Sequence, residues 1–220
     1  MRAVVLDEAG RPELAEVPKP EPGPGDALLQ MEVALTDGEP LRGAFCGIDV
    51  ATGRRVVPAG SAWPYAEYVL TPEVQLLPAP PNLTADVVAL AGPLASCLER
   101  IELARIQASQ TVAVNGPGAV ALMLCASARD AGATVIAVRS DPELAAAFGA
   151  IPGDGRGADV VLDVGDAAPT TPKTVRAALA FLASGAHPWP SLITHRVGLD
   201  ELPELLTDPP HDLLTAAVYP

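Results

Sequence analysis

Residues 111–139 constrain the fold more than any other part of the chain, because they read as strand, glycine turn, helix and strand in direct succession. Residues 111–114 form a short apolar run rich in β-branched side chains, as expected of a parallel strand that is covered on both faces. Alanine and leucine favour a helix from about residue 120 to residue 130. Gly132 ends that helix, and residues 134–138 supply a second apolar strand. The stretch therefore predicts a β–α–β unit.

The turn between the first strand and the helix has the pattern G-x-G-x-x-A, formed by Gly116, Gly118 and Ala121. In such a turn the first glycine permits the tight bend, the second lets the backbone approach a pyrophosphate, and the small third residue lets helix and strand pack closely. The helix N-terminus adds unpaired N–H groups and the positive end of a dipole. Because the pattern lies between a strand and a helix, we predict a Rossmann-type dinucleotide site. An ordinary glycine-containing turn is the alternative, and Pro117 removes one backbone donor from the loop, which predicts weaker phosphate binding.

The residues that end the second strand indicate which dinucleotide to expect. An NAD enzyme usually has Asp or Glu about 20 residues beyond the turn, where it accepts hydrogen bonds from the ribose hydroxyls. Arg139 and Ser140 stand there in this sequence, and a guanidinium can bind a 2′-phosphate through two hydrogen bonds. The sequence therefore favours NADP; a solvated arginine is the structural alternative, and Asp141, which also reads as a helix N-cap, leaves NAD possible. The predicted cofactor-binding residues are Asn115, Gly116, Gly118, Ala119, Val120, Ala121, Arg139 and Ser140.

The composition of the chain excludes several classes of partner. The formal net charge is −13 and the isoelectric point is near 4.5, whereas nucleic acids and anionic membrane surfaces bind basic protein surfaces. No apolar run approaches the length of a membrane span, and the N-terminal apolar run is too short for a signal peptide. We therefore expect a cytoplasmic protein that binds neither nucleic acid nor membrane.

Segments outside the glycine turn carry a second signal. They are RAVV at residues 2–5, the proline-rich connector of residues 18–26, YAEYV at residues 65–69, GADVVLD at residues 157–163 and LITHRVGLDE at residues 192–201. In this order they resemble the medium-chain dehydrogenase/reductase family, also called the zinc-type alcohol dehydrogenase superfamily. The resemblance covers most of the chain. It implies an NAD(P)-dependent oxidoreductase that acts on a small carbonyl or alcohol substrate.

The sequence departs from the family pattern at the positions where the family holds zinc. Thr36, in a TDGE sequence that ends at Glu39, replaces the usual metal cysteine, and Gly92 replaces the glutamate of the EPL motif. The family's GHE motif and structural-zinc cysteines have no counterpart between residues 42 and 65. Zinc needs about three protein ligands and an open position to activate an alcohol. We therefore expect no metal site, and the position of Thr36 and Glu39 assigns neither of them a catalytic role.

The cysteines and histidines do not restore a zinc site. The cysteines are odd in number and scattered, which predicts neither a disulfide framework nor metal-ligand spacing. A buried cysteine usually behaves as a small apolar residue. The histidines of the C-terminal part are expected in loops or at the surface rather than in catalysis. These residues are Cys46, Cys97, Cys125, His187, His195 and His211.

The chain is much shorter than typical family members, so the resemblance implies that two pieces are missing. One of them holds the strands that line the nicotinamide half of the cofactor cleft and build the family's dimer sheet. We therefore predict an α/β fold with a shortened Rossmann-type parallel sheet and a small β-rich GroES-like remnant, and either a monomer or a non-standard homo-oligomer. The predicted division is residues 1–83 for the GroES-like remnant, 84–184 for the Rossmann domain and 185–220 for a C-terminal return segment that packs on the N-terminal domain.

Two functions remain open at this point. The first is a zinc-independent, NAD(P)-dependent oxidoreductase of the alcohol dehydrogenase type, with NADP as the expected cofactor and no zinc. The second is a non-redox descendant of the same scaffold: a nucleotide-binding or interaction protein, or an enzyme of another reaction class that uses the same cleft.

Overall fold

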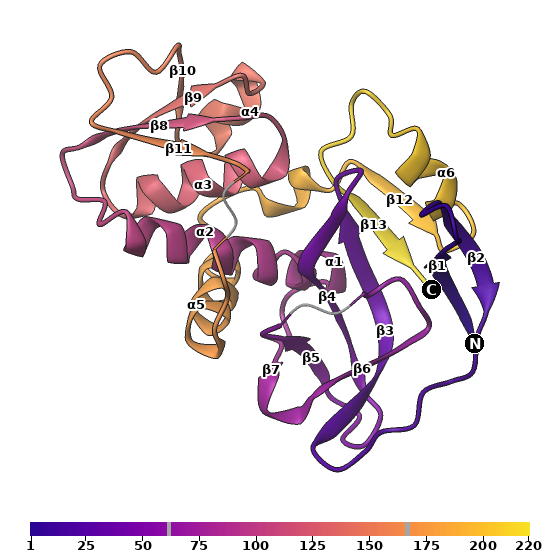
Figure 1. Ribbon diagram of the computed structural model, residues 1–220. Helices are drawn as coiled ribbons and strands as arrows, with labels where there is room; N and C mark the ends of the chain where they lie inside the picture. The colour runs from indigo at the N-terminus through magenta and orange to yellow at the C-terminus, as the bar shows by residue number, and fades with distance from the viewer. Residues whose placement is uncertain (61–62, 166–167) are drawn as a thin grey trace.

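Two main sheets organise the chain in the computed structural model, which describes residues 1–60, 63–165 and 168–220 (Figure 1). A separate antiparallel hairpin begins the chain, with β1 (Arg2–Leu6) paired to β2 (Pro12–Glu16). In the described part of the chain, no helix is both long enough and apolar enough to cross a membrane.

The first main sheet is mostly antiparallel and combines strands from both ends of the chain. Its order is β12-β13-β3-β4-β5-β7, and β6 also pairs with β3. The last strand of the chain, β13, lies antiparallel to β3, so the C-terminal segment returns to the sheet of the N-terminal part. The strands are β3 (Asp26–Thr36), β4 (Pro40–Asp49), β5 (Arg55–Pro58), β6 (Tyr68–Pro72), β7 (Leu76–Pro78), β12 (His195–Gly198) and β13 (Ala216–Tyr219).

The second main sheet is parallel and has the order β10-β9-β8-β11. Numbered by their sequence, these strands follow the order 3-2-1-4, which is the first part of the Rossmann order 3-2-1-4-5-6. The predicted combination of a shortened Rossmann-type sheet and a β-rich remnant is therefore confirmed. Within the described residues β11 is an edge strand, and its Val161 is 57% exposed. The strands are β8 (Thr111–Asn115), β9 (Thr134–Val138), β10 (Ile151–Pro152) and β11 (Val160–Asp163).

Helices α2 and α3 lie on one side of the parallel sheet (Figure 1). Alanine-rich α3 lies close to the sheet because its inward positions are small, and Ala119, Ala121 and Ala128 are all fully buried. The helices are α1 (Ala85–Ala89), α2 (Ala91–Leu103), α3 (Gly118–Asp130), α4 (Pro142–Ala147), α5 (Pro172–Ala183) and α6 (Leu202–Thr207), with short 3₁₀ turns η1 (Glu73–Gln75) and η2 (Trp189–Leu192).

One apolar core connects the two main sheets. Val33 and Cys46 from the first sheet belong to the same buried cluster as Leu94 of α2 and Val112 of β8. The two parts are therefore packed through shared side chains, and burial of this apolar area stabilises their arrangement.

Candidate functional site

The glycine turn lies at the carboxyl end of β8, where strand, helix and neighbouring strands meet. The backbone N–H of Gly116 donates a hydrogen bond to the carbonyl oxygen of Val138 at 3.2 Å, which ties the turn to β9. Gly116 has φ +148°, and a Cβ atom there would overlap the side chain of Val164. Position 116 therefore requires glycine both for its backbone conformation and for the close approach of the segment after β11.

Gly118 lies in a different environment, although it belongs to the same turn. Its φ is +85°, and among the described residues no atom lies within 4 Å of a Cβ built there. The backbone at Gly118 therefore faces open space rather than packed side chains. A close backbone approach of this kind is what a pyrophosphate needs.

The N-terminus of α3 has no side-chain cap among the described residues. By contrast, Asp141 caps α4 by accepting hydrogen bonds from the N–H groups of Glu143 and Leu144, as its position in the sequence predicted. Thr171 caps α5 by accepting a hydrogen bond from the N–H of Thr174. The first N–H groups of α3 are thus left for another acceptor, and they lie beside the open space at Gly118.

Polar side chains of three neighbouring strands meet at this edge of the sheet. Asn115 Nδ2 donates to Asp163 Oδ1 at 2.5 Å, and Arg139 Nε donates to Asn115 Oδ1 at 3.2 Å. The hydroxyl of Ser140 donates to the carbonyl oxygen of Gly116 at 3.3 Å. Arg139 is exposed and Ser140 is half-buried. The structure thus brings Asn115, Arg139 and Ser140 together around the turn.

Ala119, Val120 and Ala121 contribute backbone rather than side-chain groups to this site. They form the first turn of α3, with both alanines fully buried and Val120 half-buried. Asp163 is the residue that sequence reasoning missed. The GADVVLD segment predicts a parallel strand, and the Rossmann strand order, rather than any local pattern, places its final Asp opposite Asn115.

The TDGE segment has a structural environment of another kind. Thr36 is fully buried. Its hydroxyl donates to the carbonyl oxygen of Glu39 at 2.7 Å and accepts from the N–H of Gly38 at 3.2 Å. Both hydrogen-bonding roles of the hydroxyl are thus used within the turn that connects β3 to β4.

Comparison with solved structures identifies the architecture around these two segments. An alcohol dehydrogenase from Thermus sp. superposes with a TM-score of 0.81 at 22% identity over 100% of this chain and 99% of that chain. An acetophenone reductase from Geotrichum candidum in complex with NAD gives 0.83 at 14% identity over 100% and 97%. A proposed zinc-binding dehydrogenase from Sinorhizobium meliloti bound to NADP gives 0.77 at 22% identity over 100% and 99%.

This chain has the fold of the medium-chain alcohol dehydrogenases. The family resemblance of the sequence is thereby confirmed at the level of the fold. No protein-family model matches the sequence, and no curated protein matches it either. Identities this low show a shared architecture and leave the activity to be argued from the residues.

Within this dehydrogenase fold, the cysteines lie in the apolar interior. Cys46, Cys97 and Cys125 are all buried, and burial raises the pKa of Cys97 and of Cys125 to about 12. The pKa of Cys46 is also raised by burial, and its thiol donates to the carbonyl oxygen of Ala85 at 3.3 Å. Zinc binds the thiolate form, which such sites disfavour. Among the described residues, no group of three or more His, Cys, Asp or Glu side chains could hold a metal ion.

One of the three histidines is packed among aromatic rings. His187 stacks on Phe148 with a centroid distance of 5.8 Å and an interplanar angle of 3°, and it also contacts Phe181 and Trp189. Burial lowers the pKa of His187. His195 lies 3.8 Å from a carboxylate oxygen of Asp212, and His211 is exposed. His187 and His211 lie in loops, as expected, whereas His195 begins strand β12 and is half-buried.

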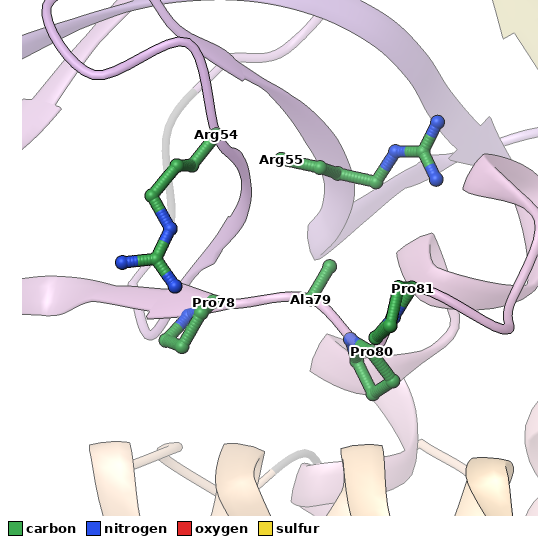
Figure 2. Close-up of a pocket in the computed structure, with 6 residues that line it drawn as sticks. All are labelled: Arg54, Arg55, Pro78, Ala79, Pro80 and Pro81. Carbon is green, nitrogen blue, oxygen red and sulfur yellow. The ribbon is translucent and has the colours of Figure 1, made fainter.

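A separate hollow of about 420 Å³ lies in the first main sheet, between the β4–β5 turn and the segment that follows β7. In Figure 2 the side chain of Arg54 lies over Pro78, whereas Arg55 turns away from it. Arg55 forms an ion pair with Glu32, with Nε 2.5 Å from Oε2. The hollow shares no residue with the glycine turn, and its arginine pair is partly neutralised by this ion pair.

Proposed function

We propose that this chain binds NADP at the glycine turn and acts as a zinc-independent oxidoreductase on a small carbonyl or alcohol substrate. One observation carries the proposal: the backbone at Gly118 faces open space directly beside the uncapped N-terminus of α3. This arrangement suits a pyrophosphate, because N–H groups and the helix dipole both favour an anion there. The dehydrogenases of the same fold that were solved with NADP or NAD support a nicotinamide cofactor.

The residues around the turn would divide the binding of NADP between them. The N–H groups of Ala119 and Val120 would donate to the pyrophosphate, while Ala121 keeps α3 close to β8. Arg139 would bind the 2′-phosphate of the adenosine ribose, and Ser140 could do so only if its hydroxyl turns away from Gly116. Bound NADP would supply or accept the hydride in such an oxidoreductase.

Zinc independence is supported by the side chains present rather than by any bound group. Position 36 is a buried threonine whose hydroxyl is used within its own turn, and the cysteines are buried with raised pKa values. We expect purified protein to contain less than stoichiometric zinc and to keep its nucleotide affinity in a chelator. Stoichiometric zinc that is lost together with activity would contradict this part of the proposal.

A second candidate function is nucleotide binding without redox chemistry. Two observations favour it: within the described residues β11 is the edge of the parallel sheet, and the Thr36 hydroxyl both donates and accepts within its own turn. In the Rossmann order, two further strands follow at this edge. A sheet that stops at β11 suits the adenosine half of a dinucleotide and encloses the nicotinamide half less well.

Titration with matched ligands separates the two functions. Three ligands should be titrated by calorimetry: NADPH, NADH and 2′-phospho-ADP-ribose, the fragment of NADP that lacks nicotinamide. Nicotinamide fluorescence should be followed in parallel. The oxidoreductase predicts tighter binding of NADPH than of the fragment and a shift in nicotinamide fluorescence. Equal affinity for NADPH and the fragment, with no fluorescence change, supports the second candidate. Failure to bind any of the three ligands contradicts both.

A further inference from the structure

Asp163, Asn115 and Arg139 form a continuous chain of hydrogen bonds across three parallel strands. Asp163 lies opposite Asn115 in the register of β11 and β8, and Asn115 lies opposite Val138 in the register of β8 and β9. Arg139 follows Val138 directly. These hydrogen bonds therefore follow the carboxyl edge of the sheet, from the edge strand β11 to Arg139, the residue proposed to bind the 2′-phosphate.

The carboxylate on one side of Asn115 and the guanidinium on the other fix the orientation of its carboxamide. A carboxylate only accepts hydrogen bonds and a guanidinium only donates them, whereas a carboxamide does one at each end. Asp163 takes the NH₂ group of Asn115 at 2.5 Å, which leaves Oδ1 to face Arg139 Nε at 3.2 Å. The reverse orientation would place oxygen against carboxylate and NH₂ against guanidinium. Asp163 therefore selects the orientation that attracts Arg139.

Arg139 depends on this contact for its position. It has a left-handed backbone conformation with φ +63°, its side chain is exposed, and among the described residues it has no ion pair. The bond to Asn115 uses Nε alone. Both terminal nitrogens of the guanidinium thus stay available to a phosphate, which they can bind through two parallel hydrogen bonds.

We propose that Asp163 is a positioning residue for NADP recognition, which holds Asn115 so that Asn115 in turn holds Arg139 at the 2′-phosphate. The proposal rests on the proposed NADP site of the glycine turn. It also accounts for a carboxylate beside an anion site, where its charge alone opposes phosphate binding. Asp163 acts through Asn115 and does not touch the nucleotide.

The test compares two substitutions at position 163 with a control just before the same strand. Asp163→Ala removes the acceptor, whereas Asp163→Asn removes the charge and keeps an acceptor for Asn115. Asp159→Ala is the control, because Asp159 precedes β11 at its other end and accepts from the N–H of Thr111 at 2.7 Å. The readout is the ratio of the NADH and NADPH dissociation constants, with the thermal midpoint of each variant recorded.

We expect Asp163→Ala to lower the preference for NADPH about fivefold, which is the effect of one ordinary hydrogen bond. Asp163→Asn should keep most of that preference, and Asp159→Ala should keep all of it. The Arg139 Nε–H resonance should shift in Asp163→Ala and stay in place in Asp159→Ala, with no nucleotide present. An unchanged preference or an unmoved resonance in Asp163→Ala would overturn the positioning role. If wild-type protein binds neither NADPH nor NADH, the proposed function is contradicted, and with it the positioning role of Asp163.

Discussion

The TDGE turn lies where the resembled family holds its metal cysteine, the glycine turn is the predicted dinucleotide site, and their surroundings differ. Thr36 is fully buried, and its hydroxyl is bonded on both sides by its own turn. Gly118 faces open space, beside a helix N-terminus that no described side chain caps. In the TDGE turn the Thr36 hydroxyl is hydrogen-bonded within the turn. At the glycine turn the first N–H groups of α3 stay available to a ligand.

This difference makes the glycine turn the candidate binding region of the fold. Buried polar groups that are satisfied by their neighbours stabilise a fold, whereas backbone donors left open at a helix N-terminus favour an anionic ligand. The buried cluster that includes Val33, Cys46 and Leu94 joins the two main sheets through packed apolar side chains. We therefore base the proposed nucleotide site on the glycine turn and assign no reacting group to the TDGE turn.

The largest effect is expected from Gly116→Ala, which tests the packing side of the glycine turn. The new Cβ would meet Val164 while the backbone keeps a positive φ, and the two costs together lower the free energy of unfolding by about 3 kcal/mol. Gly118→Ala is the matched variant, because it shares the positive φ but meets no atom. It should cost about 1 kcal/mol and weaken NADPH binding instead. Chemical denaturation measures both, and equal losses of stability would contradict the contrast between the two glycines.

Arg139→Asp tests whether the site at the glycine turn binds the 2′-phosphate of NADP through Arg139. We expect the preference for NADPH over NADH to fall by about ten- to hundredfold, because a charged hydrogen-bond donor is replaced by a group that repels the phosphate and suits ribose hydroxyls. Dissociation constants for both nucleotides give the measurement. An unchanged cofactor preference would remove Arg139 from the site.

The secondary structure around the glycine turn can be predicted from local sequence. The hydrogen bonds between its polar side chains cannot, because they join residues that lie far apart in the sequence. The predicted β–α–β unit and the capping of α4 by Asp141 are confirmed, because these features depend on residues close together in the chain. The helix α3 starts at Gly118, two residues earlier than about residue 120, as is usual for predicted helix ends. The bond between Asn115 and Asp163 joins residues 48 positions apart. That pairing depends on strand order, which no local pattern encodes.

Thr36 illustrates the same limit at the other segment. Its replacement of a metal cysteine was visible in the sequence, but the use of its hydroxyl depends on the three-residue turn between β3 and β4. Thr36→Val should lower the free energy of unfolding by about 1–2 kcal/mol, because it leaves the Glu39 carbonyl and the Gly38 N–H without this partner. NADPH affinity should stay unchanged. A loss of nucleotide affinity without a loss of stability would reverse the contrast between the two segments.

The smallest effect concerns the contact between the return segment and α1. Burial would raise the pKa of Asp86, but hydrogen bonds from Thr84 and Arg196 outweigh it and hold that pKa below the usual value of 3.8. A lowered folded-state pKa means stability that is present above the unfolded-state pKa and lost as the pH falls through the folded-state pKa. Asp86→Asn should therefore flatten the dependence of unfolding free energy on pH below about 3.8, and a slope equal to wild type would contradict this assignment. Cofactor preference should not change.

A crystal structure of the protein soaked with NADPH tests the central claim most directly. The account predicts the pyrophosphate over Gly118 at the N-terminus of α3, and the 2′-phosphate within hydrogen-bonding distance of Arg139. Density for the nucleotide at any other place, or a glycine turn left without it at saturating NADPH, would contradict the account.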